Sequence, residues 1–190
     1  MSKQGLLADL RAEMLAEKVC DELASQAKQL VMGDGDVNAD IVFIGEAPGK
    51  KEDELGVPFV GAAGRFLNEM LAVAGMKRED VYITNIVKYR PPDNRDPLPA
   101  EKAAFWPYLE KQLQIIDPKV VVTLGRHSMG YFLPNSKIGE VHGQPERVRL
   151  GGKEIVVVPL YHPAAALYNG GMRQTLIDDF LKVPGIIAEL

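Results

Sequence analysis

The sequence is poor in cysteine, in excess positive charge and in long apolar runs. Its 190 residues include one cysteine, Cys20, which cannot form a disulfide within the chain, so the sequence does not require an oxidising compartment. With 22 basic and 26 acidic residues, the net charge is −4, which argues against a uniformly positive surface but allows a local basic groove. The longest apolar runs, such as residues 155–160, are far shorter than the ~20 residues that span a bilayer, and no secretory signal opens the chain. We therefore expect a soluble, cytoplasmic protein that does not contact membranes.

The rest of the composition is that of an ordinary globular protein, with 46% hydrophobic and 25% charged residues. A chain of this length fits one domain and buries roughly 70% of its unfolded surface. Apolar residues spaced three and four apart between Leu6 and Leu15 predict an amphipathic helix near the N-terminus. The sequence contains no internal repeat and no domain linker. We expect residues 1–190 to form a single domain with this N-terminal helix.

Strand and helix patterns alternate along the chain. Residues 32–39 are expected to form a loop, and apolar runs predict four core strands, at residues 40–45, 81–87, 119–125 and 153–160. The last strand follows a hairpin turn at Gly151 and Gly152, and helical patterns separate the others. This order predicts a mostly parallel sheet covered by helices on both faces. In such sheets ligands bind beyond the carboxyl ends of the strands, so the loops at those ends are the candidate site.

Three of these loops have unusual sequences: "GEAPGKKEDELGVPFVGAAG" from Gly45, "TNIVKYRPPDNRDPLP" from Thr84, and "YHPAA" from Tyr161. The first is rich in glycine but matches neither common phosphate-binding template. Gly49 arrives one place too early for a Walker A loop, and the Gly-x-Gly-x-x-Gly pattern is absent. A tight turn alone would explain the glycines, but it does not explain why Phe59 stands among small residues.

Together these three motifs resemble those of family 4 uracil-DNA glycosylases, and the resemblance runs from about Cys20 to near the C-terminus. It implies a three-layer α/β/α fold with a central four-stranded, mostly parallel sheet, and an enzyme that removes uracil from DNA. It also implies that Phe59 stacks on the flipped uracil, Asn85 reads its polar edge and His162 faces its O2. The same pocket is expected to include Gly45, Glu46, Ala47 and Gly49.

These residue types suit the chemistry. A base flipped out of a duplex needs an aromatic face, a carboxamide offers both an acceptor and a donor to uracil, and a donor at O2 stabilises charge on the departing base. Glu46 is the candidate for stabilising the cationic sugar and holding the attacking water, so we name Glu46, Asn85 and His162 as catalytic. No lysine is expected where a Schiff base with the sugar would form, although Lys88 is near, so we predict a monofunctional enzyme.

The resemblance breaks down at the four cysteines with which the family usually holds an iron–sulfur cluster. Tyr89 and Phe105 stand at two of these places, and Cys20 is the counterpart of one more. One thiolate cannot hold a cluster that needs four ligands. We therefore expect no metal and no organic cofactor, and we expect the rings of Tyr89 and Phe105, with Trp106 or Tyr108, to fill the volume that the cluster would occupy.

Contacts to DNA are expected from a further set of residues: Lys88, Arg90, His142, Pro163, Ala164 and Leu167. Leu167 is a candidate wedge between bases, although ordinary packing at a helix start would look the same. His142 is equally compatible with a phosphate contact or a structural role. His127 is expected to be a helix-start or surface residue, and the charged residues 50–54 a solvated loop.

The sequence thus predicts a monomeric, monofunctional uracil-DNA glycosylase that acts on uracil in single-stranded or double-stranded DNA. Two alternatives stay open. One is a descendant with weak or no catalysis that binds DNA or uracil, and the other is a nucleotide-binding α/β protein that acts on a small molecule. The presence of Phe59, Asn85 and His162 in three separate loops favours the enzyme.

Overall fold

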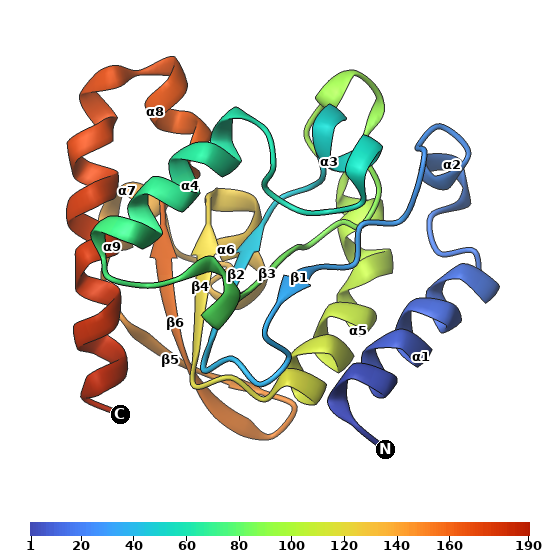
Figure 1. Cartoon of the computed structure of the whole chain (residues 1–190), viewed down its shortest axis with the longest axis horizontal. Coiled ribbons are helices and arrows are strands. Elements are labelled where there is room, and N and C mark those ends of the chain that lie inside the picture. Colours follow the sequence, from blue (N-terminus) through green and yellow to red (C-terminus); the bar gives the residue numbers. More distant parts are fainter.

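The chain folds around one central sheet with helices on both sides (Figure 1). The computed structural model describes all 190 residues. The strands are β1 (Asp34–Gly35), β2 (Ile41–Gly45), β3 (Tyr82–Asn85), β4 (Val120–Leu124), β5 (Glu146–Leu150) and β6 (Lys153–Leu160). The longer helices are α1 (Lys3–Ala16), α4 (Ala62–Val73), α5 (Pro99–Ile116) and α9 (Arg173–Ala188). The shorter helices and 3-10 turns are α2 (Asp21–Ala24), α3 (Lys50–Leu55), α6 (Arg126–Phe132), α7 (Ile138–Val141), α8 (Ala164–Tyr168), η1 (Arg78–Asp80), η2 (Pro92–Asn94) and η3 (Gly170–Met172).

The sheet has the strand order β1-β3-β2-β4-β6-β5, in which the four central strands are parallel. The four-stranded prediction is therefore right for the centre and incomplete at the edges, where β1 and β5 add antiparallel strands. The expected hairpin at Gly151 and Gly152 joins β5 to β6. β1 lies in the segment predicted as a loop, because a strand of two residues is too short to show any periodicity.

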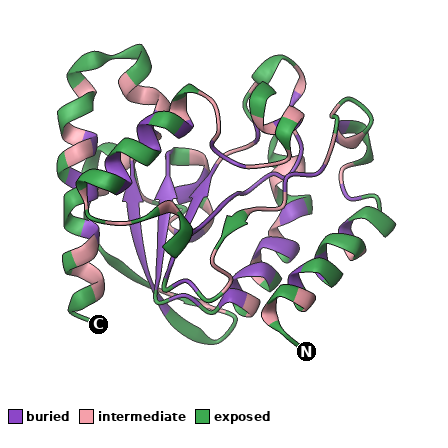
Figure 2. Ribbon diagram, viewed as in Figure 1, coloured by how far each residue is buried: buried purple, intermediate pink, exposed green.

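Two hydrophobic cores lie on opposite faces of this sheet. Val42 and Ile44 of β2 pack in the core that includes residues of α1 and α5, whereas Ile41 and Phe43 pack in the core that includes residues of α4 and α9. Successive residues of a strand point to opposite faces, so a sheet covered on both sides needs strands that are apolar throughout. Figure 2 shows the central strands buried and the outer helix surfaces exposed. None of the helices combines the length and apolar character that crossing a bilayer requires.

The carboxyl ends of the central strands position the loops that carry the sequence motifs. Gly45, at the end of β2, is paired with Asn85, at the end of β3. From β2 the chain passes to β3 on one side, and it then returns to β4 on the other side of β2. A reversal of this kind leaves a crevice beyond the strand ends, so the fold itself creates a binding position there.

Aromatic packing joins α5 to the segment after β3. Phe105 is fully buried, and its ring meets the ring of Tyr89 edge to face with the centroids 6.0 Å apart. Trp106 stacks on Tyr131 with the ring centroids 4.7 Å apart, and the partly buried Cys20 packs against the same core. Tyr89 and Phe105 are thus in contact, whereas the expectation that they fill the volume of a cluster stays a prediction. Rings in these arrangements add to the stability that burial of their apolar area supplies.

We predict that Phe105→Ala lowers the free energy of unfolding by ~3–5 kcal/mol, because it leaves a cavity in a fully buried aromatic cluster. Urea denaturation followed by circular dichroism measures the change. Tyr168→Ala is the matched control, since the Tyr168 side chain is 91% exposed, and it should change stability by less than ~0.5 kcal/mol. Equal losses in the two variants would contradict a stabilising role for the cluster.

Candidate functional site

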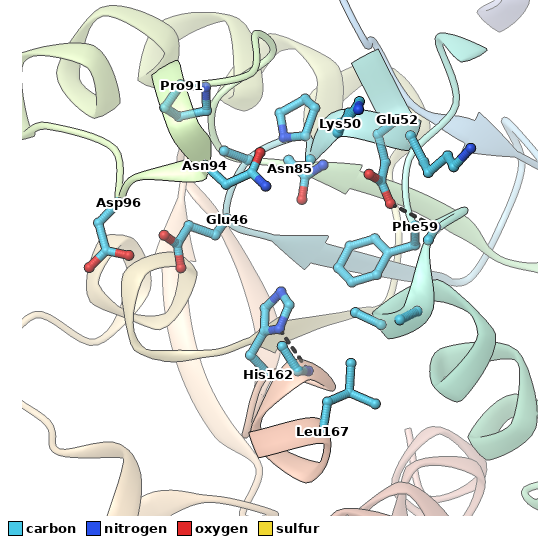
Figure 3. Close-up of a pocket in the computed structure, with 18 of the residues that line it drawn as sticks. Glu46, Lys50, Glu52, Phe59, Asn85, Pro91, Asn94, Asp96, His162 and Leu167 are labelled. Atoms are coloured by element: carbon cyan, nitrogen blue, oxygen red, sulfur yellow. Dashed lines mark hydrogen bonds between the residues drawn. The ribbon is translucent and has the colours of Figure 1, made fainter. Parts of the chain in front are cut away.

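A cavity of about 530 Å³ opens beyond the carboxyl ends of the central strands (Figure 3). Its walls come from the loops after β2, β3 and β6 and from the beginning of α4. The predicted site residues that line it are Glu46, Ala47, Gly49, Phe59, Asn85, His162, Ala164 and Leu167. The fold thus brings together residues from all three sequence motifs.

Gly45 lies behind this wall, where there is no space for a side chain. A Cβ atom there would stand 2.5 Å from Oδ1 of Asn85 and 2.5 Å from the Cζ atom of Phe59. Real Cβ atoms do not approach other atoms so closely, so either side chain would have to move. The glycine therefore lets the amide and the ring approach the backbone of β2.

The backbone of Phe59 is held in an unusual conformation, with φ at 51°. The guanidinium of Arg78 donates to the carbonyl oxygens of Phe59 and Pro58, at 2.9 and 2.5 Å. Gly64 provides the space on the other side, because a Cβ there would lie 2.0 Å from the carbonyl oxygen of Phe59. A left-handed conformation in a non-glycine residue costs free energy, and these contacts keep the ring of Phe59 in the cavity wall.

The charged block after Gly49 is helix α3, and two of its acids have internal partners. Glu52 accepts hydrogen bonds from the backbone N–H groups of Val60 and Gly61, both at 3.0 Å. Asp53 is buried and accepts from the N–H groups of residues 28 and 29. The prediction of a solvated charged loop is therefore wrong for Glu52 and Asp53, because they anchor neighbouring backbone.

The two lysines of this charged block lie at the cavity. Lys50 and Lys51 are exposed, and both belong to the cavity lining. That no lysine stands where a Schiff base with the sugar would form stays a prediction, and these two residues are the lysines that could contradict it. Both residues occupy the first turn of α3, directly after Gly49.

Asn85 presents a free acceptor to the cavity. Its side chain is 2% exposed, yet its buried Oδ1 atom has no hydrogen-bond partner within the chain. Leaving a buried amide oxygen unpaired costs about 1–3 kcal/mol, so such an atom is expected to find a partner in a ligand. Asn85 therefore satisfies the geometric requirement for reading a polar ring edge.

His162 presents a donor to the same cavity. Its Nδ1 accepts a hydrogen bond from the backbone N–H of Ala164 at 3.1 Å, so the neutral ring carries its proton on Nε2. Burial is the main cause that lowers the pKa of His162 to about 4, and the ring is therefore neutral at neutral pH. The ring lies 5.6 Å from that of Phe59, measured between centroids. His162 can thus donate from Nε2 to a ligand that rests beside Phe59.

Glu46 also lines the cavity. Burial, followed by the negative charge of Asp96, raises the pKa of Glu46 to about 7, while Arg126 and Lys102 oppose the shift. The N–H of Val87 donates to the carbonyl oxygen of Glu46 at 3.1 Å, which fixes the backbone from which the side chain projects. A carboxyl group with this pKa can accept or release a proton near neutral pH.

Lys88 does not reach the surface, so its prediction as a DNA contact is wrong. Its side chain is fully buried, and Nζ donates to Thr84 Oγ1 at 2.6 Å, to the backbone oxygen of Asn85 at 2.8 Å and to Gln112 Oε1 at 2.7 Å. Burial lowers the pKa of Lys88 to about 7. The lysine lies beneath the site and fixes the strand end that carries Asn85.

Three other residues predicted to contact DNA, Arg90, His142 and Pro163, lie outside the cavity lining. Arg90 donates from Nε to Asn94 Oδ1 at 2.7 Å. His142 lies 2.5 Å from the buried Asp179, measured between Nδ1 and Oδ2, and Pro163 is buried. Sequence reasoning missed several residues that do line the cavity, among them Asn94 and Asp96 of the proline-rich loop. The signal that could have identified them is that they lie in the motif that begins at Thr84.

The residues that replace the family's cluster ligands do not fit an iron–sulfur cluster. Cys20 is the only cysteine of the chain, and burial is the main cause that raises the pKa of its thiol to about 11. The rings of Tyr89 and Phe105, which stand where the family resemblance implies two ligands, supply no sulfur.

One cluster of acidic and imidazole groups lies at the cavity, formed by Glu46, Asp96 and His127. Two cationic groups lie against it: a guanidinium nitrogen of Arg126 is 3.5 Å from Asp96 Oδ2, and Lys102 Nζ is 3.5 Å from His127 Nδ1. Positive charges at these distances repel a cation. The cluster therefore suits proton exchange better than metal binding.

Comparison with known proteins places the chain among glycosylases. The sequence model described as "Uracil DNA glycosylase superfamily" matches residues 32–183. A type-4 uracil-DNA glycosylase of Sulfurisphaera tokodaii is 46% identical over 185 residues, covering 93% of this chain and 83% of that protein. Similar enzymes of the same name come from Archaeoglobus fulgidus, at 45% identity over 93% of this chain and 91% of its own length, and from Thermotoga maritima, at 40% identity over 95% of both chains.

We predict that Lys88→Met lowers the free energy of unfolding by ~2 kcal/mol, because it leaves three buried acceptors without their donor. The pKa of Lys88 falls from 10.5 to about 7 on folding, so between these pH values the unfolded chain binds more protons than the folded chain. The stability contribution of this group therefore rises with pH from about 7 to 10.5. Urea denaturation at several pH values should show this rise in the wild type and its loss in Lys88→Met. An identical pH dependence in both would contradict the buried amine.

We also predict that the purified protein is colourless and contains less than ~0.1 iron per chain, because one cysteine cannot bind a cluster. Elemental analysis and the visible absorption spectrum test this directly. Incubation with an iron chelator should leave the circular dichroism spectrum and the melting temperature unchanged. A brown preparation that bleaches and unfolds with the chelator would overturn the prediction.

Proposed function

The chain belongs to the uracil DNA glycosylase superfamily, and from this membership we propose that it is a type-4 uracil-DNA glycosylase. It hydrolyses the N-glycosidic bond of deoxyuridine in DNA after the base has flipped into the cavity. The observation that carries this proposal is the unpaired, buried Oδ1 of Asn85 at the wall formed with Phe59. A flat base with an N–H on its edge would satisfy this acceptor.

Uracil complements Asn85 better than cytosine does. The N3–H of uracil would donate to Oδ1, and the carboxamide N–H₂ would donate to a uracil carbonyl. Cytosine has an acceptor at N3 and an amino group beside it, so it would set like groups against like and leave buried atoms unpaired. Mismatches of this kind support discrimination of ~10⁴-fold or more.

The chemical step uses charge that develops as the bond to the sugar breaks. The departing base gains negative charge, which the Nε2–H of a neutral His162 would stabilise at O2. The ring of Phe59 would hold the base by stacking, an interaction worth ~1–3 kcal/mol. Catalysis follows because the His162 contact becomes stronger in the transition state than in the bound substrate.

The sugar gains positive charge in the same step. In its ionised form Glu46 would stabilise this cation and position the attacking water, which makes water the nucleophile and the enzyme monofunctional. Because Lys50 and Lys51 lie at the cavity, the prediction that no lysine attacks the sugar needs a direct test. Borohydride should not trap the protein on uracil-containing DNA, because no Schiff base forms. Covalent trapping would assign a lysine to the chemical step.

DNA approaches along the rim of the cavity. The exposed Leu167, with Ala164, would contact the strand beside the flipped base, and Arg90 and His142 would contact phosphates. The prediction of a DNA contact at Pro163 is not kept, because this residue is buried. We propose that the protein acts as a monomer, in the cytoplasm with the DNA, on both single and double strands.

Neutralising one phosphate contributes about 0.9 to the slope of the logarithm of duplex affinity against the logarithm of salt concentration. Arg90→Ala should therefore reduce the size of that slope by about 0.9.

We predict that His162→Ala reduces the single-turnover rate of uracil excision by ~10²-fold or more while DNA affinity changes little. Phe59→Ala should weaken both affinity and rate, because stacking precedes bond cleavage. Asn85→Ala should lower the excision rate because it removes the acceptor that reads the base. A labelled oligonucleotide that is cleaved at the abasic site by alkali provides the measurement.

The matched control is Tyr168→Ala, which removes an exposed side chain at the outer edge of the cavity and should affect excision less than any of the three variants. If the wild type binds uracil-containing DNA tightly but releases no uracil, the binding-only alternative replaces the enzyme. If it binds no DNA at all, the small-molecule alternative does.

A further inference from the structure

Three side chains from separate segments meet beside the cavity. Glu46 comes from the loop after β2, Asp96 from the loop before α5, and His127 from the first turn of α6. One nitrogen or oxygen atom of each lies within 4.8 Å of those of the other two. The His127 Nε2 is 3.3 Å from Asp96 Oδ2 and 3.8 Å from Glu46 Oε1, and it makes no hydrogen bond to either carboxyl group. Figure 3 shows Asp96 and Glu46 next to each other at one end of the cavity.

The neighbours of His127 determine which of its nitrogens faces the carboxylates as a donor. Lys102 Nζ lies 3.5 Å from Nδ1, and an ammonium group can only donate. Nδ1 is therefore the acceptor, and the proton of the neutral ring is on Nε2, the atom nearest to Asp96. Burial, then the charge of Lys102, lowers the pKa of His127 and favours this neutral form.

Asp96 has basic neighbours on two sides. Besides His127, the guanidinium of Arg126 lies 3.5 Å from its Oδ2. Partial burial acts to raise the pKa of Asp96, but the neighbouring His127, Glu46 and Arg126 outweigh it, so the pKa of Asp96 lies below its ordinary value. Two carboxyl groups this close do not readily both ionise, and the proton that they share belongs mainly to Glu46.

Charged and titratable groups surround Glu46 on several elements. They are Asp96 before α5, Lys102 in α5, Arg126 and His127 in α6, and His162 after β6. Asp96 raises the pKa of Glu46, whereas Lys102 and Arg126 lower it. Asp96 is therefore the neighbour whose removal should make Glu46 ionise at lower pH.

We propose that Asp96, which lies beside His127, is a positioning residue that controls whether Glu46 carries a proton, and thereby the pH range in which uracil is excised. Below this range the proton stays on Glu46, hydrogen-bonded to Asp96. Above it, the proton leaves to solvent and the Glu46 carboxylate faces the sugar. The effect on excision rests on the proposed function, whereas the effect on Glu46 itself does not.

The first experiment measures the single-turnover rate of uracil excision from pH 5 to pH 9. The wild-type rate should rise with pH and level off above about 7, the pKa of Glu46. In Asp96→Asn the rise should move to lower pH, so that the ratio of the rate at pH 5.5 to that at pH 8.5 increases by at least ~3-fold. Asp96 is exposed over 63% of its side chain, so its replacement should not prevent folding.

Two variants separate this effect from a merely structural one. His127→Gln keeps a donor for Asp96 and should retain the wild-type pH profile, whereas His127→Ala releases Asp96 and should shift the profile in the same direction as Asp96→Asn. Glu46→Gln should be slow and lack the Glu46 inflection. An Asp96→Asn profile that matches the wild type in position would overturn the proposal.

A second measurement needs no catalysis. The ¹³C chemical shift of the labelled Glu46 carboxyl group should titrate near pH 7 in the wild type and at lower pH in Asp96→Asn. If the titration moves but the wild type excises no uracil, the proposed function fails and the coupling of the two acids stands. If the protein excises uracil but the titration midpoint does not move, the coupling fails alone.

Discussion

The close approach of Asn85 and Phe59 to the backbone of Gly45 is the constraint on which the site depends. Parallel pairing of β2 with β3 sets Gly45 beside Asn85, and the absence of a side chain at Gly45 leaves space for the amide and the ring. The φ of Gly45 is not positive, so glycine is needed here for the close approach of the two side chains and not for an unusual backbone conformation. The two groups that face a base are thus fixed by a sheet register and not by a flexible loop.

A second layer of polar contacts stabilises this arrangement from below. Lys88 joins Thr84, Asn85 and Gln112, and Gln112 in turn donates to the backbone oxygen of Met32 and to the hydroxyl of Tyr82. Buried polar groups are stable only when their partners are in place, so a network of this kind favours one conformation of the strand end. The side-chain Oδ1 of Asn85, at the cavity wall, is a buried acceptor that this network leaves unpaired.

The protein environment reverses the usual order of two titrating groups. Burial lowers the pKa of His162 to about 4, and burial together with Asp96 raises that of Glu46 to about 7. In free amino acids the order is the opposite, because a glutamic acid side chain has a lower pKa than an imidazolium. The result is a neutral N–H donor on one side of the cavity and a carboxyl group that exchanges its proton near neutral pH on the other. Separate environments thus give neighbouring residues separate roles in one reaction.

The sequence by itself predicted the central parallel sheet and the three motif loops, because apolar runs, glycines and motif order are local signals. Phe59, Asn85 and His162 were singled out by the resemblance of these motifs to a known family, and all three line the cavity. It could not show that Lys88 is buried, since a lysine is usually exposed and only its three acceptors explain its position.

The tertiary structure alone decided the contacts between segments that are far apart in the chain. Asp96 and His127 meet Glu46 across gaps of tens of residues, and the two residues of β1 form a strand only because β3 lies beside them. The physical reason is the same in each case: burial, pairing and pKa depend on neighbours in space, which the chain order does not specify.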